Sequence, residues 1–343
     1  MVTRAVLAGI GLAFACAAGC SLLTSYEGFG PAAEATPACG KRWPARPAIA
    51  DSGERELVGA VSRLTLFDPP DGGRLGYDLD GLCTCPDPRQ ACRPRSAVPP
   101  CDEIGTGVDN AAGEILGNIF SANGPDPLNE DLALGRHGVV VRIRGYNGRL
   151  NDPKVQVSLF NVIGLRDAER AAFDGRDAFV VDALESTDFG THFIDTSAYV
   201  AGGVLVAALD FDLRLNAQVA DASTPVLAPI RAARLIGTVR IIGESGLELD
   251  DAQIVGRVRQ EDLFRQIGRL GLCPGTELYP RVRTQACGLL DLPADPGRDR
   301  GDAPCDAISF AIGIRVTAAT IGGQGQAHDG DGVCGAAPVE PCP

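Results

Sequence analysis

Two short segments of the chain carry the same pattern of aspartate, glycine and cysteine. Residues 78–83 (DLDGLC) and 329–334 (DGDGVC) both read D-x-D-G-x-C. Aspartates two residues apart can direct their carboxylate oxygens at one hard cation, and the glycine lets the backbone turn around that ion. Calcium is therefore a candidate cofactor, with four candidate ligands: Asp78, Asp80, Asp329 and Asp331.

Neither segment matches an EF-hand loop, which needs a glycine at its sixth position and an acidic residue at its twelfth. Counted from Asp78 the twelfth residue is Arg89, and counted from Asp329 the sixth is Cys334. The segments resemble the calcium loops of thrombospondin-type repeats over the D-x-D-G core alone. The alternative interpretation is an Asp-Gly turn beside a disulfide, because both residue types are common in turns.

The amino terminus has the pattern of an export signal. A basic stub, residues 1–4, precedes an apolar run over residues 5–18 that is too short to cross a bilayer as a helix, and Gly19 and Cys20 follow. The segment resembles the signal of bacterial lipoproteins, which implies cleavage after residue 19 and lipidation of Cys20. Ser21 stands where retained inner-membrane lipoproteins carry aspartate, so the resemblance implies anchoring to the outer membrane, which two or three acyl chains make stable. The alternative is an ordinary secretory signal cut near Ala18.

An exported chain rich in cysteine is expected to form disulfides. Of the twelve cysteines, Cys16 lies in the signal and Cys20 is the lipid site, which leaves an even set of ten. They fall in two groups, one up to Cys101 and one from Cys273 onward. In the first group, residues 83–101 are spaced C-x-C-x6-C-x8-C, without the paired C-x2-C of structural zinc sites. The pairing stays open, as does the question whether the two groups bridge to each other. The disulfide candidates are Cys39, Cys83, Cys85, Cys92, Cys101, Cys273, Cys287, Cys305, Cys334 and Cys342.

Signatures of the common catalytic chemistries are missing from the sequence. The three histidines are far apart and form no H-E-x-x-H motif, and neither G-x-S-x-G nor S-x-x-K occurs. We therefore predict no catalytic residues and a protein that is not an enzyme. The alternative is a glycoside hydrolase whose two carboxylates come from distant strands. Asp210 and Asp212 share one face of a predicted strand, but such alternation usually marks the solvated side of a sheet.

Composition sets the class of protein and its partners. With 343 residues, 45% of them hydrophobic, the chain can bury a large core. The net charge of -13 repels phosphate backbones and anionic lipid headgroups, so we expect no nucleic-acid partner and membrane contact only through the lipid. Aromatic residues make up 5% of the chain, fewer than a protein that stacks on sugars would carry.

Hydrophobic residues alternate with polar ones through most of residues 138–243, which predicts half-buried strands. Hairpin turns are expected at 146–148 (YNG) and 201–203 (AGG). Two short helices are predicted, one after Asp109 and one over residues 260–270. Further strands are expected over residues 57–67, 179–184, 191–200 and 308–321.

Because strands predominate and do not alternate with helices, we predict an antiparallel β-sandwich or jelly roll, of the concanavalin or laminin-G type among others. The cysteine-rich loop of this sandwich covers residues 68–107. The predicted segments are a signal peptide (1–19), a lipidated amino terminus with a flexible tether (20–50), the sandwich domain (51–322) and a tail rich in Gly, Asp and Cys (323–343).

Several features together resemble uncharacterised lipoproteins of GC-rich Gram-negative bacteria. These are the lipid signal, the GYDLDGLCTC loop at 76–85, the YNGRLND hairpin at 146–152 and the CDAIS strand at 305–309. The resemblance implies no activity. We expect a non-catalytic lipoprotein, on the periplasmic face or the cell surface, whose sheet binds an unknown protein or glycan. The alternatives are the glycosidase and a purely structural envelope protein.

Overall fold

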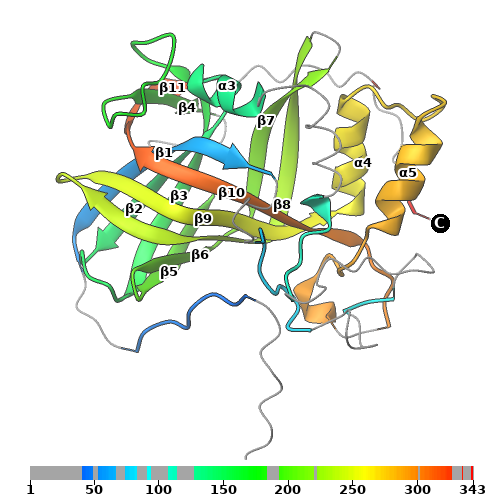
Figure 1. Ribbon diagram of the computed structural model, residues 1–343, viewed down its shortest axis with the longest axis horizontal. Helices are drawn as coiled ribbons and strands as arrows, with labels where there is room; N and C mark the ends of the chain where they lie inside the picture. The colour runs from blue at the N-terminus through cyan, green and yellow to red at the C-terminus, as the bar shows by residue number, and fades with distance from the viewer. Residues whose placement is uncertain are drawn as a thin grey trace, which may run out of the picture. The chain divides into compact units, whose positions relative to one another are not determined.

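Eight antiparallel strands close into a barrel (Figure 1). The computed structural model describes residues 41–48, 53–66, 74–82, 91–93, 107–113, 127–183, 193–219, 222–299, 302–326, 334 and 341–342. The barrel strands are β1 (Arg55–Thr65), β2 (Val139–Tyr146), β3 (Asp152–Leu165), β5 (Ile194–Ala201), β6 (Val204–Ala208), β8 (Ala222–Ile242), β9 (Gly246–Arg259) and β10 (Ala307–Ala318). Around the barrel they follow the order β3, β2, β1, β10, β9, β8, β6 and β5.

The prediction that the chain is mainly β-structure is confirmed, but the predicted fold, a β-sandwich or jelly roll, is wrong. Strand β5 pairs with β6 on one side and with β3 on the other, so the two ends of the strand row meet. No second sheet is needed to cover the first, because a closed sheet faces itself across its own interior. The register shifts of β3 against β5, at Asp152/Val155 and Val155/Val157, are the irregularities that help a sheet bend to closure.

Both predicted hairpins are confirmed. Strands β2 and β3 are joined by the five residues 147–151, and β5 and β6 are joined by Gly202 and Gly203. The last two residues have φ values of 60° and 86°. Turns with two consecutive residues of positive φ match the twist of antiparallel strands, and glycine adopts this conformation at little cost.

Over the ranges that the structure describes, three strands and four named helical segments lie outside the barrel. Strand β4 (Ala178–Asp182) pairs with β3, β11 (Thr320–Gly325) pairs with β4, and β7 (Phe211–Val219) pairs with the first half of β8. The predicted helix at 260–270 is confirmed as α4, whereas most of the one predicted after Asp109 falls on residues outside the described part. The helical segments are α3 (Pro127–Ala133), α4 (Gln260–Arg269), α5 (Tyr279–Gly288) and the 3-10 turn η1 (Pro296–Arg298).

One strand was expected over residues 308–321, where the structure has two. The chain leaves the barrel after Ala318, and β11 then runs parallel to β4 in the outer layer. Helix α5 was not predicted from the sequence. In the part of the chain that the structure describes, no helix is long and apolar enough to cross a membrane.

Aliphatic side chains fill the barrel, and two further apolar clusters lie on its outside. The inner cluster includes Leu57, Val141, Val157, Leu205 and Ile312, all of which are 0% exposed. Outside, one cluster packs β4 and β11 against β2 and β3, and the other gathers around β6, β8, β9 and β10. Because these two outer clusters cover parts of the barrel's outer surface, several strands are buried on both faces.

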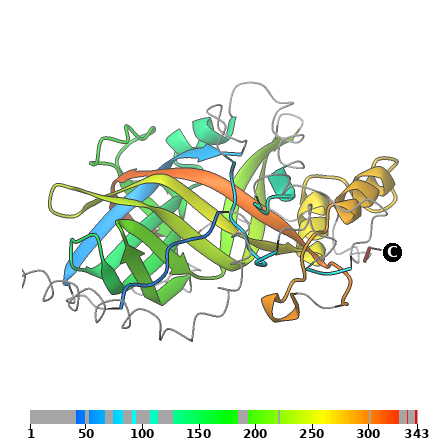
Figure 2. The ribbon, with the colours of Figure 1, turned by 60° about the horizontal axis from the view of Figure 1, so that its bottom comes forward.

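Residues 41–48, hereafter the strap, cross the outer face of the barrel (dark blue in Figure 2). These residues belong to the segment predicted as a flexible tether (20–50). The Arg234 guanidinium lies 4.4 Å from the centroid of the Trp43 ring, and the Tyr199 hydroxyl donates to the Pro44 carbonyl at 2.6 Å. Arg46 donates to the carbonyl oxygens of two barrel residues at 2.9 and 2.5 Å. The strap is therefore fixed to the barrel by its own side chains.

Among the described residues, three disulfides link predicted cysteines: Cys92–Cys305, Cys273–Cys334 and Cys287–Cys342. The first joins the two cysteine groups, which answers the question that the sequence left open. The other two fasten the end of the chain to the region of α4 and α5. Cys20, Cys39, Cys83, Cys85 and Cys101 lie outside the described residues.

Candidate functional site

The turn at residues 78–81 brings its two aspartates together with a third carboxylate. One ligand oxygen each from Asp78, Asp80 and Asp109 lies within 4.8 Å of the others, and all three residues are buried. Asp109 arrives there because Tyr77 and Asp109 form an antiparallel bridge. The first two residues are candidate calcium ligands, whereas Asp109 directly precedes a predicted helix and no local motif marks it as a ligand.

Hydrogen bonds within the chain shape this turn. Asp78 accepts the Gly81 N–H at 2.5 Å and the Arg42 Nε–H at 3.0 Å. Asp80 accepts the Leu82 N–H at 2.7 Å, and Asp109 accepts the Leu79 N–H at 2.6 Å. Gly81 has a φ of 75°, a conformation that favours glycine. The aspartate carboxylates at this turn therefore accept hydrogen bonds from N–H groups of the chain itself.

The same three carboxylates form an oxygen donor set of the kind that Ca²⁺ binds in proteins. The Arg42 guanidinium compensates one of the three negative charges, because it lies 3.0 Å from the Asp78 carboxylate. The other two predicted ligands, Asp329 and Asp331, lie outside the described residues. The structure thus brings two of the four predicted ligands together and adds a third.

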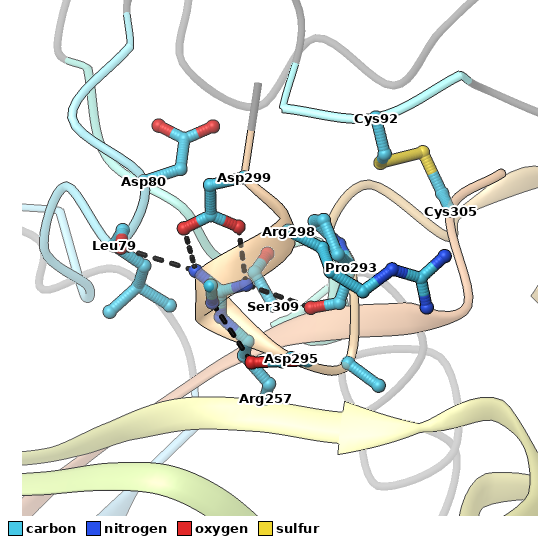
Figure 3. Close-up of polar contacts among 12 residues, drawn as sticks. Leu79, Asp80, Cys92, Arg257, Pro293, Asp295, Arg298, Asp299, Cys305 and Ser309 are labelled. Atoms are coloured by element: carbon cyan, nitrogen blue, oxygen red, sulfur yellow. Dashed lines mark hydrogen bonds and ion pairs between the residues drawn. A yellow bond between two sulfur atoms is a disulfide. The ribbon is translucent and has the colours of Figure 1, made fainter. Parts of the chain in front are cut away.

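Arg257 of β9 fixes the backbone between the two aspartates of the turn (Figure 3). Its guanidinium donates to the Leu79 carbonyl at 3.3 Å and to the Pro293 carbonyl at 2.8 Å. It also forms a bidentate ion pair with Asp299, with both contacts at 2.7 Å. The Arg257 side chain is only 2% exposed, so this ion pair connects the turn to residues 293–299 through the interior.

A groove of about 640 Å³ opens on the outside of the barrel next to this turn. Its floor is made by strands β1, β8, β9 and β10, and its walls come from the strap and from residues 74–77. The Gln253 side-chain oxygen accepts the Gly76 N–H at 2.8 Å, which holds the second wall against β9. Asp78 donates its N–H to the Lys41 carbonyl at 3.0 Å, so the turn and the strap are directly linked.

Basic side chains predominate in the groove. Its lining includes the basic residues Lys41, Arg63, Arg74 and Arg315 and one acidic residue, Asp251. The Lys41 ammonium lies 4.5 Å from the centroid of the Tyr77 ring. Burial lowers the pKa of Lys41, and the negative charge of Asp251 opposes that shift. Burial also raises the pKa of the Tyr77 hydroxyl.

Asp251 has an unusual backbone conformation for a residue in a strand. Its φ is 48°, in the left-handed region that residues with a side chain rarely adopt. It lies in β9, where Asp250 and Gln253 pair with β8 on either side of a register shift. Asp251, the one carboxylate in the described lining of the groove, therefore lies at a strained bulge, and strain of this kind is frequent at functional sites.

The aspartates weighed for acid–base chemistry serve the fold. Asp212 forms an ion pair with Arg231 at 2.7 Å, and Asp210 accepts the Ala232 N–H at 2.8 Å. Neither lines the groove.

Sequence reasoning missed the groove because its basic residues come from four segments that are far apart in the chain. Lys41 lies in the strap, Arg63 in β1, Arg74 in the wall and Arg315 in β10. Only the strand pairing brings them together. No family model, curated protein or solved structure matches this chain.

Proposed function

We propose that this chain is a non-catalytic lipoprotein of the bacterial cell envelope that binds a ligand in the groove on the outside of its barrel. The groove is the observation that carries the proposal. The interior of the barrel is occupied by aliphatic side chains, whereas the groove is an accessible recess of about 640 Å³. Recesses of roughly 300 to 1,000 Å³ hold small ligands in many proteins.

The lining of the groove supports binding over glycoside hydrolysis. Hydrolysis of a glycosidic bond generally uses two carboxyl groups on opposite sides of the bond. Among the lining residues that the structure describes, Asp251 is the one carboxylate. The remaining polar groups of the floor, such as Thr65 and Thr238, can donate and accept hydrogen bonds but cannot serve as acid and base near neutral pH.

The lipid anchor in this proposal rests on Cys20 and the preceding signal-like segment, and it places the protein at the outer membrane. Cells expressing the wild-type chain, Cys20→Ser or Cys16→Ser are fed an alkyne fatty acid and fractionated. We expect label and outer-membrane association for the wild type and for Cys16→Ser, whose change lies in the signal. Cys20→Ser should lose both. Equal labelling of all three chains, or an unlabelled wild type, would contradict the anchor.

The groove itself is tested with a neutral probe, so that the result does not depend on ligand charge. Gly40–Pro343 forms one compact unit, so the chain from residue 20 onward with Cys20→Ser is suitable for NMR titration. Benzyl alcohol should shift the amide signals of groove residues such as Thr65 and Gly313. Thr238→Trp, which fills the groove, should abolish these shifts, while Thr196→Trp on exposed β5 should not. Shifts centred elsewhere would contradict the proposal.

A further inference from the structure

Two arginines face each other across the floor of the groove. Arg63 of β1 and Arg315 of β10 are directly opposite in the antiparallel ladder, and both are exposed. Like charges at opposite positions of neighbouring strands repel each other. Neither arginine forms an ion pair with a residue of the described part of the chain.

Other arginines on the sheet have acidic neighbours. Arg144 lies opposite Glu56 in the ladder of β1 and β2, and the two side chains form an ion pair at 2.7 Å. Arg240 forms one with Asp250 at 2.8 Å. Because the chain has 44 acidic and 31 basic residues, the facing arginines do not result from a shortage of acidic residues.

The rest of the groove adds to this positive charge. Among the lining residues that the structure describes, Lys41 and Arg74 are also basic, and Asp251 is the one acidic residue, in a protein of net charge -13. A cleft lined by one sign of charge concentrates the field and attracts ligands of the opposite sign. The described lining is therefore mostly basic, in contrast to the acidic chain as a whole.

The groove also has an apolar part. Leu75, Val204, Ile236 and Ile314 line it beside the charged residues. Leu75 and Ile236 belong to the outer apolar cluster that supports this side of the barrel, so these walls are held in place by packing. A ligand of this groove can therefore combine a charged group with an apolar body.

From these observations we propose that the groove binds a small organic oxyanion, with its phosphate or carboxylate group between Arg63 and Arg315 and its apolar part on the aliphatic wall. The planar guanidinium group matches the geometry of both oxyanions and donates two hydrogen bonds to each. A bound oxyanion replaces the repulsion between the two arginines with attraction. The inference rests on the proposed function and specifies the class of ligand.

The test compares four probes by NMR titration of the chain from residue 20 onward with Cys20→Ser. The probes are phenyl phosphate, phenylacetate, benzyl alcohol and inorganic phosphate. At least one of the two aromatic anions should bind at least tenfold more tightly than benzyl alcohol, and the comparison between them shows which oxyanion the groove prefers. Inorganic phosphate should bind more weakly than phenyl phosphate, because it leaves the aliphatic wall uncovered.

Variants then assign the binding to the two arginines. Arg63→Gln and Arg315→Gln should each weaken binding of the preferred anion at least tenfold and leave that of benzyl alcohol unchanged. Arg240→Gln is the matched control, since Arg240 is an exposed strand arginine outside the groove, and it should leave both affinities unchanged. Without ligand, the thermal midpoints of the two groove variants should equal or exceed that of the wild type, because a repulsion is removed.

Each failure has a different meaning. If both anions bind no more tightly than benzyl alcohol, the ligand class is wrong while the groove remains a binding site. If no probe binds in the groove, the proposed function fails as well. If the anions bind equally well to Arg63→Gln and Arg315→Gln, the assignment to these residues is wrong. A thermal midpoint several degrees lower in both ligand-free variants would show that the arginines serve the fold.

Discussion

Removing the carboxylate of Asp299 should destabilise the protein strongly, because it leaves the charge of Arg257 buried without its acidic partner. The Arg257 side chain is 2% exposed, and that of Asp299 is 14% exposed. Both guanidinium contacts to the carboxylate measure 2.7 Å (Figure 3). After Asp299→Ala the guanidinium keeps its hydrogen bonds to the Leu79 and Pro293 carbonyls, but these carry no negative charge.

The expected size follows from these contacts. Breaking a buried ion pair by removing one partner typically costs about 3 to 5 kcal/mol of unfolding free energy. The two carbonyl contacts remain, so we expect Asp299→Ala to lie near the lower end, at about 3 kcal/mol. In the double variant Arg257→Met/Asp299→Ala no uncompensated charge remains. Its loss should therefore be smaller than the sum of the losses of the two single variants.

The measurement is equilibrium unfolding in urea with the disulfides intact, on the wild type, both single variants and the double variant. The slope of free energy against urea concentration should stay constant, so that midpoints report stability. Asp250→Ala is the control, because its ion pair with Arg240 is partly exposed to solvent and should contribute less than about 1 kcal/mol. A loss below about 1 kcal/mol for Asp299→Ala, or strict additivity in the double variant, would refute the reasoning.

Three further predictions concern calcium, pH and the disulfides. Asp80→Ala should lower the thermal midpoint more in calcium than in chelator, because in calcium the variant loses an ion ligand as well as the hydrogen bond from the Leu82 N–H. Equal losses in calcium and in chelator would mean that the three carboxylates bind no calcium and serve only the turn. Burial lowers the pKa of His137 from 6.5 to about 4, so the unfolded chain binds the extra proton in this window, and stability should fall as the pH drops from 6.5 to 4. In His137→Gln this dependence, measured by urea unfolding, should be shallower by up to about 1.4 kcal/mol per pH unit, and an unchanged slope would contradict the burial argument. Replacing both Cys92 and Cys305 by serine should cost roughly 2 to 5 kcal/mol in the same assay, whereas an unchanged midpoint would mean that the bridge does not constrain the chain.

Alternating hydrophobicity predicts strands but does not determine how a sheet closes. In β2 the outward-facing Val140 is as fully buried as the inward-facing Val141, because β4 and β11 cover that side of the barrel. A sandwich and a barrel both place every second residue inside. The contact that distinguishes them is the pairing of β3 with β5, which depends on strand register and bulges and leaves no local mark in the sequence.

The candidate sites likewise combine residues that are close in the sequence with residues that only the fold brings together. Asp78 and Asp80 lie two positions apart in a turn motif, so their proximity is predictable from the sequence. Asp109 joins them through a bridge with Tyr77. Arg63 and Arg315 become neighbours only through the ladder of β1 and β10, with 251 residues between them. Secondary-structure propensity predicts each of these segments separately, but it does not predict which residues of distant segments become neighbours.

Trp43 is the chain's only tryptophan, and it lies in the strap. Its ring packs against the outer apolar cluster, 6.1 Å from the Tyr77 ring and next to the Arg234 guanidinium. Tryptophan fluorescence of the whole protein therefore comes from one position in the strap, two residues from Lys41, which lines the groove. A red shift in its emission reports the strap leaving the barrel, and circular dichroism reports loss of the strands. The two signals separate detachment of a groove wall from unfolding of the barrel without any added label.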